Sequence, residues 1–389
     1  MIDSADRFDR IRQTEFHELE DSAYLNAASL GPLPQRSRAA VTDYAARRAR
    51  VQTMSDADFV EPAKHARTAA ARLIGATPEE IALGPNTSFG INVAATGLQV
   101  PRGSIVLASE GEFPANVYPW MNRDRLRLEL VPRTAEGWPD EDRLLERIAA
   151  GGVSILATSS VQFHTGFRAN LERLGRVCRQ HDTFLVVDAI QSLGCLPMDV
   201  RQSGADVVAT GGHKWLCSPF GSGFAFVRRE IQERLDPQFI GWYSMHAGRE
   251  FEALTGYEWG FVPDASRYEV GTLAQQDLIG FAESVSVLLE AGVSGIRNHV
   301  DALLEPLRNW ILEHPEVSSL SSFDPSRRSG IVSFRPPAVE RVYRELQRAG
   351  VVCSVREGGI RIAAHLYNTS RHIELVLEVL ETRAAEGWG

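Results

Sequence analysis

The chain contains very little lysine: among its 389 residues, only Lys64 and Lys214 carry a primary amine on the side chain. The combined count of lysine and arginine is 41, so subtracting these two leaves 39 arginines. The chain therefore uses arginine for almost every positive charge but has kept a lysine between His213 and Trp215. Only a primary amine condenses with an aldehyde to form an imine, because a guanidinium group stays protonated. Lys214 is therefore a candidate for covalent chemistry.

Cysteine is also sparse, and its four residues lie far apart: Cys178, Cys195, Cys217 and Cys353. No C-x-x-C pair occurs, and no spacing of cysteine and histidine is typical of a disulfide framework or a zinc site. We therefore expect free thiols in a reducing compartment, which favours the cytoplasm.

The sequence lacks both a long apolar run and an excess of basic residues. No run reaches the length of a membrane-spanning helix, and the charged stretch 1–16 has no apolar segment of the kind found in a signal peptide. The net charge is −9, which gives no electrostatic reason to expect nucleic acid or an anionic membrane as a partner. The length suits two domains, and 44% hydrophobic residues is typical of a globular protein.

Short β-branched runs alternate with amphipathic stretches through the middle of the chain. The runs that predict strands are 104–109, 126–132, 153–159, 184–189, 205–211 and 223–229. The stretches that predict helices are 34–52, 60–74, 87–97, 139–150, 170–181 and 274–290. Several strands are apolar without alternation, as expected when helices cover both faces of a parallel sheet. The pattern predicts an α/β fold with a mostly parallel sheet.

The pattern changes after residue 264. A long helical region, 274–313, precedes strands at 330–336, 350–355 and 360–363 and helices at 338–349 and 370–385. We therefore predict a large domain over 21–264 and a smaller α+β domain over 265–389, with segment 1–20 packing on the smaller domain.

Two of the predicted strands end in polar groups. One ends at Asp188, with Gln191 three residues later, and another ends in two glycines followed by His213 and Lys214. Ligands of open α/β sheets bind at the carboxyl ends of the strands. The pair of Asp188 and Lys214 has an ordinary explanation as a buried salt bridge. The alternative is a site for pyridoxal phosphate (PLP), which needs a lysine for its aldehyde, a carboxylate for its pyridine nitrogen and donors for its phosphate.

Candidate phosphate donors lie at the start of a predicted helix, in "LGPNTSFG" (83–90). Asn86, Thr87 and Ser88 precede or begin that helix, where backbone N–H groups are free to bind an anion. An ordinary helix cap explains the same residues.

These motifs together resemble the class V aminotransferase-fold group of PLP enzymes, of fold type I. That group includes cysteine desulfurases, kynureninases and isopenicillin N epimerase-like proteins. The resemblance extends from "YLNAASLGPLP" (24–34) to "IRIAAHLYNT" (360–369) and is most specific in "VVDAIQSLG" with "GGHKWL". It implies a Lys214 aldimine and Asp188 on the pyridine nitrogen. It also implies Gln191 on the ring hydroxyl, and His213 with the 86–88 turn on the phosphate.

Three further matches follow from the same resemblance. Phe113 in "EGEFPANVYPW" falls where the group stacks a ring on the cofactor, and desulfurases have histidine there. Thr272 in "YEVGT" matches a strand that reaches the partner's phosphate, which implies a homodimer with a shared site. Arg361 matches the arginine that binds the substrate carboxylate, with Asn26 or Arg356 as other anchors. Phe113 could instead be a core residue, Thr272 a turn residue and Arg361 part of a surface ion pair.

The chain also departs from the group. Gly211 stands three residues before the lysine, where serine is frequent, so one phosphate donor is missing. The segment 159–166 lacks the usual asparagine near the ring, and Gln162 is our candidate for its replacement. Cysteine desulfurases carry a mobile persulfide cysteine on a loop, but the segment 350–361 leaves little room for that loop, and Cys353 lies in a strand-like run. A persulfide shuttle is therefore not expected.

These residues predict a PLP-dependent enzyme that acts at Cα or Cβ of an amino acid, with Lys214 and Asp188 as the catalytic residues. A lyase-type or epimerase-like reaction is the first hypothesis, by analogy with the group, and transamination is the alternative. A non-catalytic, metabolite-binding descendant of the fold is less favoured because Lys214, Asp188 and Arg361 are all present. A metal enzyme that uses His164, His213 and His246 is a further alternative, although those histidines lack ligand spacing.

Overall fold

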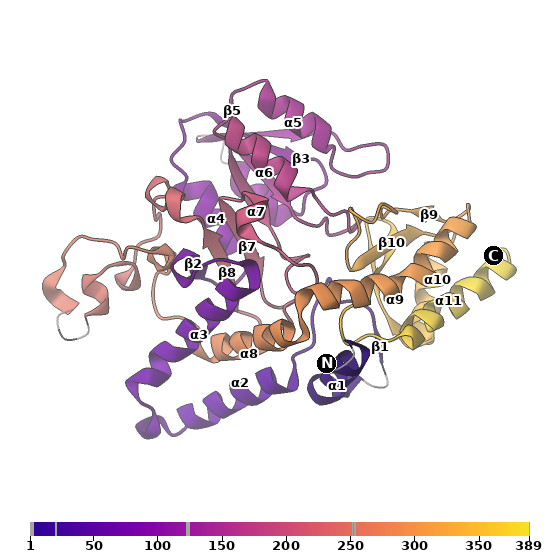
Figure 1. Ribbon diagram of the computed structural model, residues 1–389, viewed down its shortest axis with the longest axis horizontal. Coiled ribbons are helices and arrows are strands. Elements are labelled where there is room, and N and C mark those ends of the chain that lie inside the picture. The colour runs from indigo at the N-terminus through magenta and orange to yellow at the C-terminus, as the bar shows by residue number, and fades with distance from the viewer. Residues whose placement is uncertain (1–3, 20–21, 122–124, 251, 253, 389) are drawn as a thin grey trace.

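The computed structural model describes residues 4–19, 22–121, 125–250, 252 and 254–388. Its centre is a seven-stranded sheet in the order β2-β8-β7-β6-β5-β3-β4, in which β8 alone runs antiparallel to its neighbours (Figure 1). The strands are β2 (Ile81–Leu83), β3 (Ser104–Ser109), β4 (Leu126–Val131), β5 (Val153–Ser159), β6 (Phe184–Asp188), β7 (Val207–Gly211) and β8 (Gly223–Val227). All six predicted central strands are therefore confirmed, whereas β2 was not predicted.

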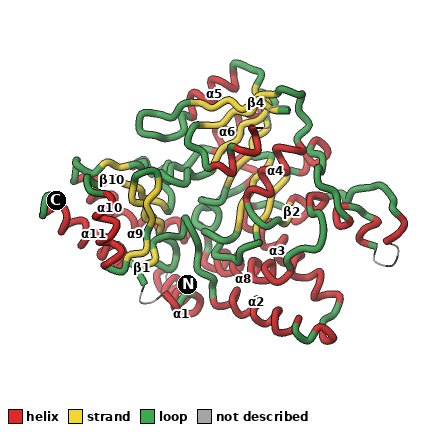
Figure 2. The backbone as a smooth tube through the Cα atoms, turned by 180° about the vertical axis from the view of Figure 1, so that it is seen from behind, coloured by secondary structure: helices red, strands yellow, loops and turns green. Residues whose placement is uncertain are grey.

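Helices cover both faces of this sheet, as the absence of alternation in its strands indicates. Ala157 and Val186 face one side and share a core with Ile91 of α4 (Thr87–Gly97). Leu156 and Leu185 face the other side and share a core with residues of two further helices, α5 (Glu141–Ala149) and α6 (Leu171–Gln180). Figure 2 shows the strands enclosed in this way. Because the core holds the parallel strands from both sides, their carboxyl ends are fixed relative to one another.

A second helical layer lies beneath the sheet and consists of α2 (Gln35–Arg48), α3 (Asp56–Ile74) and α8 (Gln275–Ala291). The Ser37 hydroxyl donates to the carbonyl of Gly280 at 2.8 Å, and a Cβ on Gly280 would lie only 2.6 Å from Val41. This close approach explains a glycine inside a helix. The short N-terminal helix α1 (Ser4–Glu15) packs on the same layer. The domain boundary at residue 264 stays a prediction, since α8 lies beyond it and packs on α2 and α3.

The predicted helical region 274–313 is two helices rather than one. Gly292 has φ of +81°, and the chain bends there by 72° between α8 and α9 (Val293–Glu313). Within the described residues, no single helix is long and apolar enough to cross a bilayer, and only the bent pair of α8 and α9 together meets that criterion.

The C-terminal part forms a four-stranded antiparallel sheet in the order β12-β13-β10-β9. Its elements are β9 (Ser318–Ser319), β10 (Ile331–Arg335), β12 (Ser354–Arg356), β13 (Gly359–Ala363), α10 (Val339–Arg348) and α11 (Ser370–Ala385). The predicted strand 350–355 is wrong as one element. Its first half, β11 (Val351–Val352), pairs in parallel with β1 (Ala23–Tyr24), whereas β12 forms a tight hairpin with β13, so the chain changes sheets at Cys353. Pairing with β1 therefore divides the predicted strand between two sheets.

A buried ion pair ties α3 to the segment that follows the central sheet. Arg67 of α3 makes two hydrogen bonds to the carboxylate of Glu269, at 2.6 and 2.8 Å, and the Glu269 side chain is fully buried. Glu269 also accepts from the backbone N–H of Leu83 on β2 at 2.8 Å.

We expect Glu269→Ala to lower the free energy of unfolding by about 3–5 kcal/mol, because it leaves the Arg67 charge without its partner in a buried position. Differential scanning calorimetry measures the accompanying drop in Tm. The matched control is Glu61→Ala on the same helix, where the exposed carboxylate pairs with Lys64, and about 1 kcal/mol or less is expected. Equal losses in the two variants would contradict the structural importance of the Arg67–Glu269 pair.

Candidate active site

Four parallel strands deliver polar residues to one edge of the central sheet. The loop after β3 carries Glu112, and β5 ends at Ser159, in register with Asp188 at the end of β6. The turn after β7 carries His213 and Lys214. The prediction that Asp188 and Lys214 lie at neighbouring strand ends is confirmed by the pairing of β6 with β7.

Lys214 lies in a largely enclosed position with its amine 5.6 Å from the centre of the Phe113 ring. Burial lowers the pKa of Lys214 to about 8; Asp188 opposes this shift, while the positive charges of Arg361 and Arg356 add to it. No carboxylate among the described residues lies within salt-bridge distance of the amine, so the alternative of a simple buried salt bridge with Asp188 is not what the structure contains. A partly deprotonated amine is the form that attacks an aldehyde.

Asp188 is almost completely buried at the end of β6. Burial raises the pKa of Asp188 to about 7, although its Oδ1 accepts from the backbone N–H of Ile190 at 3.0 Å. A buried carboxylate of this kind is stabilised by a neighbouring cationic N–H, as a protonated pyridine nitrogen would supply.

Glu112 was not singled out from the sequence, yet it is a buried carboxyl group of this site. Its Oε1 accepts from the backbone N–H of Ser159 at 2.9 Å and from Nε2 of Gln162 at 2.7 Å. Its other oxygen accepts from the Ser159 hydroxyl and from Nδ2 of Asn116 at 3.2 Å. Burial raises the pKa of Glu112, and its charge in turn raises the pKa of Asp188. Of its three partner residues only Asn116 is near in the sequence, so no local pattern indicates that this carboxyl group is buried.

The two glutamine candidates are both buried, and each makes hydrogen bonds within the protein. Gln162 donates to Glu112, so Glu112 fixes the direction of its amide. Gln191 accepts from the Trp215 indole N–H at 2.8 Å and donates to the carbonyl of Ala28 at 3.1 Å. The contact of Gln191 with the ring hydroxyl of the cofactor and that of Gln162 near the ring stay predictions.

The candidate phosphate site is the N-terminus of α4. Asn86 caps the helix by accepting from the backbone N–H of Phe89 at 3.0 Å, so the ordinary cap proposed from the sequence is confirmed. The buried hydroxyl of Thr87, however, has no hydrogen-bond partner among the described residues. A buried donor without a partner at a helix N-terminus fits an anionic group.

His213 and Phe220 stack with ring centres 5.3 Å apart, and burial lowers the pKa of His213. A Cβ on Gly211 would lie 3.1 Å from Nδ1 of this histidine, so the glycine allows the imidazole to sit against the backbone. Ser88 is exposed at the start of α4, and Thr272 is exposed in the loop before α8.

Phe113 is 40% exposed, so the alternative that it is a core residue is wrong. Its ring meets that of Phe163 edge-on with centres 5.2 Å apart, and the Lys214 amine lies 5.6 Å from the centre of the Phe113 ring.

Arg361 of β13 faces the same site from the smaller sheet and is only 2% exposed. It donates to the carbonyl of Phe163 at 2.6 Å and to the hydroxyl of Ser29 at 2.7 Å. Its Nε is buried without a partner, and no carboxylate pairs with it anywhere in the described part of the chain. Burial lowers the pKa of Arg361 to about 10, with a smaller contribution from Arg356. The alternative of a surface ion pair is therefore wrong, and an anionic ligand would complete its hydrogen bonds.

The other two anchor candidates lie close by. Arg356 also donates to the Ser29 hydroxyl, at 3.4 Å, and is exposed. Asn26 forms an isolated bridge with Ala363, and its buried Oδ1 has no hydrogen-bond partner among the residues described.

The part of the chain that the structure describes shows neither a metal centre nor a reactive thiol. Over the described residues, no three side chains of histidine, cysteine, aspartate or glutamate are grouped so as to hold a metal ion. Cys353 is buried between β11 and β12, where burial raises its pKa to about 12. A thiol with such a pKa is a packing residue rather than a nucleophile.

The comparisons with known proteins agree with this geometry. The family model described as aminotransferase class-V matches residues 24–376. The chain belongs to the class V aminotransferase family. It is similar to a probable cysteine desulfurase of Methanothermobacter thermautotrophicus (29% identity, 95% of this chain and 96% of the relative). It is also similar to the isopenicillin N epimerase of Streptomyces clavuligerus (27% identity, 93% of this chain and 95% of the relative).

A solved structure titled as a mutant of C-DES, with glycine covalently linked to the PLP cofactor, superposes on the model with a TM-score of 0.84. The two chains are 21% identical, and the match covers 94% of this chain and 98% of the other. Members of the class V family are PLP-dependent, and the fold is that of fold-type I enzymes. The orphaned Thr87 hydroxyl, the buried Asp188 and the enclosed Lys214 of this chain fit that cofactor.

The lowered pKa of Lys214 predicts how cofactor loading depends on pH. With a pKa near 8, roughly a tenth of the amine is neutral at pH 7, far more than for an ordinary lysine. We expect the rate of covalent PLP attachment to apoprotein to rise up to about pH 8 and then to level off. Stopped-flow absorbance measures this rate, with N-acetyl-lysine as the control whose rate keeps rising to about pH 10. A protein profile that also rises to pH 10 would contradict the lowered pKa.

Proposed function

We propose that this class V enzyme catalyses a lyase-type or epimerase-like reaction at Cα and Cβ of an amino acid. The observation that carries the proposal is that the site holds both Lys214, whose pKa is lowered to about 8, and Arg361, a buried guanidinium that lacks an anionic partner among the described residues. An α-amino acid has an amino group and a carboxylate on one carbon, so this pair is matched to its two ends.

Each residue has a definite task in this proposal. When bound, PLP supplies an electron sink for the bonds at Cα. Lys214 holds the cofactor between turnovers and moves the proton at Cα. Asp188 stabilises the proton on the pyridine nitrogen, Phe113 covers one ring face, and Arg361 binds the carboxylate. Thr87, with the free N–H groups of α4, binds the phosphate.

The environment of Cys353 supports a reaction without a persulfide on this chain. The thiol is buried, and its pKa is raised to about 12. The other three cysteines are also buried, and burial raises the pKa of each. A sulfur acceptor requires a thiolate that can leave its pocket, and the described part of the chain offers none.

Product identification tests the proposed reaction class. The PLP-loaded protein is incubated with each common L- and D-amino acid, and the products are identified by mass spectrometry and chiral chromatography. Release of a 2-oxo acid with ammonia, or inversion at Cα, is the expected result. Stoichiometric conversion of the cofactor to pyridoxamine phosphate, with a second oxo acid required for turnover, would instead establish an aminotransferase.

Arg361→Ala is expected to lower kcat/KM for the preferred amino acid by roughly 10- to 100-fold, because one charge-assisted hydrogen-bond pair contributes about 1.5–3 kcal/mol. Arg361→Lys is the matched control and should recover only part of the loss, since an ammonium lacks the planar fork. The decarboxylated amine should be a poor substrate for the native enzyme, and the Ala variant should discriminate less between the two. A variant that keeps the native preference for the carboxylate would move the anchor to Asn26 or Arg356.

We also propose that the enzyme works as a homodimer in the cytoplasm. The described residues of 239–250 and 254–262 project from the body of the molecule (Figure 1) and expose Tyr257 (84%) and Trp259 (78%). Thr272 lies exposed at the base of this segment and lines a cavity of about 360 Å³ with Gly84 and Phe89. Exposed aromatic side chains of this size are typical of surfaces that a partner covers.

Sedimentation combined with subunit mixing tests the shared site. We expect a dimer, and we expect a mixture of Lys214→Ala with a Thr272→Arg variant to regain activity that neither has alone. Full activity of a monomer at assay concentration would contradict the dimer proposal.

A further inference from the structure

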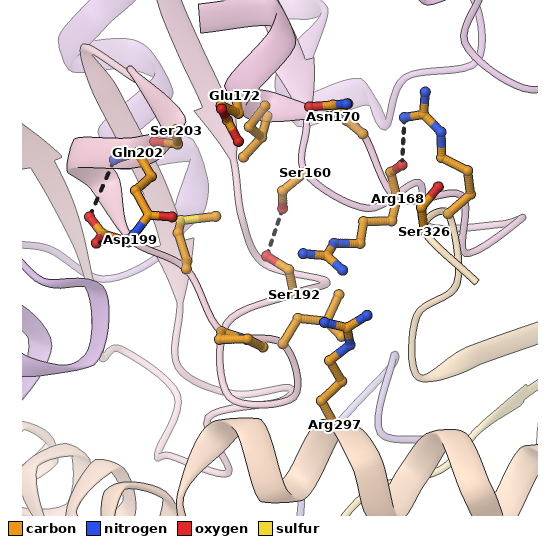
Figure 3. Close-up of a pocket in the computed structure, with 16 residues that line it drawn as sticks. Ser160, Arg168, Asn170, Glu172, Ser192, Asp199, Gln202, Ser203, Arg297 and Ser326 are labelled. Carbon is orange, nitrogen blue, oxygen red and sulfur yellow. Dashed lines mark hydrogen bonds between the residues drawn. The ribbon is translucent and has the colours of Figure 1, made fainter. Parts of the chain in front are cut away.

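A polar cavity of about 360 Å³ lies beside the 188–192 loop, between the central sheet and α9. Figure 3 shows two arginines directed into its middle: Arg168, from the loop that precedes α6, and Arg297, from α9. The two residues are 129 positions apart, so only the fold brings their charges together.

Neither guanidinium group forms an ion pair with a carboxylate among the described residues. Arg168 is half-buried, and in the described part of the chain neither Arg168 nor Arg297 has a side-chain hydrogen bond or an ion pair. Burial lowers the pKa of Arg168, and the nearby positive charges of Arg297 and Arg327 lower it further. Two cations that repel each other in a partly enclosed space cost free energy unless an anion neutralises them.

The acidic side chains at the cavity wall do not serve as that anion, because each already has a partner. Glu172 pairs with Arg176 at 3.2 Å. Asp199 accepts from the backbone N–H of Arg201 at 2.8 Å and from the side chain of Gln202 at 3.0 Å. The third arginine, Arg327, is likewise satisfied, since it makes two hydrogen bonds of 2.8 Å to Glu141. The charged side chains of the cavity that lack a partner among the described residues are therefore the two cations, Arg168 and Arg297.

Hydrogen bonds to Arg327 fix the backbone of Arg168 at the cavity wall. Its backbone N–H donates to the carbonyl of Arg327 at 2.9 Å, and its own carbonyl accepts from the Arg327 side chain at 3.3 Å. Hydroxyl groups lie at the same wall: those of Ser160 and Ser192 are 2.6 Å apart. A guanidinium without a carboxylate partner, in a wall that also carries polar side chains, suits carboxylate and phosphate oxygens.

We propose that Arg168 and Arg297 form a binding site for a small organic dianion, a dicarboxylate or a phosphate monoester, separate from the catalytic site. The cavity volume is about ten times the roughly 30 Å³ that one water molecule occupies in the liquid. The cavity therefore accommodates a molecule with two charged ends or a phosphate with an attached carbon chain. One end binds Arg168 near the Ser160–Ser192 pair, and the other binds Arg297 on α9.

The same hydroxyl pair connects the cavity to the cofactor side of the loop. Ser160 donates to the backbone carbonyl of Asp188 at 3.2 Å, and Ser192 donates to that of Ala189 at 3.1 Å. A ligand near this hydroxyl pair would therefore lie next to groups that are hydrogen-bonded to the backbone of Asp188 and Ala189.

Isothermal titration calorimetry on the PLP-loaded protein tests the site with succinate and glycerol 1-phosphate as the two probes and acetate as the monoanion control. We expect saturable binding of one dianion, at least about tenfold weaker in both Arg168→Gln and Arg297→Gln because each removes a charged hydrogen-bond partner. Arg297→Lys should lie between native and Gln. Arg361→Gln removes the anion anchor of the catalytic site and should leave this binding unchanged, as should Arg173→Gln, whose exposed arginine pairs with Asp142 on the outer surface.

Three results would overturn the proposal: no saturation with either dianion, binding that survives both glutamine substitutions, or binding that is lost in Arg361→Gln, which would assign the ligand to the catalytic site. Circular dichroism checks that each variant is folded, and Arg297, half-buried on the surface of α9, gives a decisive variant even if Arg168→Gln fails to fold. The preference between the two probes distinguishes a dicarboxylate from a phosphate monoester. None of these readouts depends on which amino acid the enzyme converts.

Discussion

Replacing Lys214 by alanine is expected to remove the visible absorbance of covalently held PLP and to lower turnover by roughly 10⁴-fold or more, the scale seen when a residue of covalent catalysis is deleted. In the proposed function Lys214 has two tasks, attachment of the cofactor and proton movement at Cα, and the only other lysine of the chain, Lys64, pairs with Glu61 on α3. Absorbance spectra of purified protein and turnover with the preferred amino acid measure the two effects.

The scarcity of lysine makes the control for this experiment unusually clean. Lys64→Ala removes the only other lysine, which is exposed and pairs with Glu61 on α3. We expect it to retain the absorbance and the activity. Borohydride reduction followed by peptide mapping should place the label on Lys214; a label on Lys64 would reject the assignment of the cofactor lysine.

Asp188→Asn is expected to keep the cofactor bound but to lower kcat by about 10²–10³-fold, which corresponds to about 3–4 kcal/mol of lost electrostatic stabilisation. An amide cannot stabilise a protonated pyridine nitrogen, so less electron density is withdrawn from Cα. Single-turnover kinetics separates this chemical step from binding. Near-native turnover would reassign Asp188 as a structural residue.

The stability of the cofactor-free variant serves as the control for Asp188→Asn. The pKa of Asp188 is raised to about 7 in the folded protein, so its ionisation opposes folding as the pH rises from about 4 to 7, and the penalty persists above that range. Cofactor-free Asp188→Asn should therefore be at least as stable as the native apoprotein at pH 8. A large drop in its Tm would mean that the activity loss reflects misfolding.

Much of the fold and the central part of the site could be predicted because they depend on local patterns. The strands that end at Asp188 and before Lys214 are continuous apolar runs, and runs of that kind belong to a covered parallel sheet. Once two such strands are neighbours, their terminal residues meet, whatever the rest of the chain does.

The remaining parts depend on contacts between distant segments. Nothing in the sequence around Glu112 indicates that Ser159 and Gln162 will enclose its carboxyl group, 47 and 50 residues away. The change of sheet at Cys353 depends on the N-terminal strand, which pairs with β11 across more than 300 residues. Arg168 and Arg297 likewise read as ordinary surface charges until α9 is placed against the loop before α6.

The exposed Lys64 and the enclosed Lys214 have a further consequence for how selectively this protein reacts with aldehydes. Free pyridoxal phosphate and metabolic aldehydes attach to surface amines, and on most proteins dozens of lysines compete with the catalytic one. Here only one accessible lysine competes with Lys214, and it is held by Glu61. An amine-directed probe on the purified protein therefore meets one competing lysine side chain, and a single Lys64→Arg change would leave Lys214 as the sole lysine of the chain.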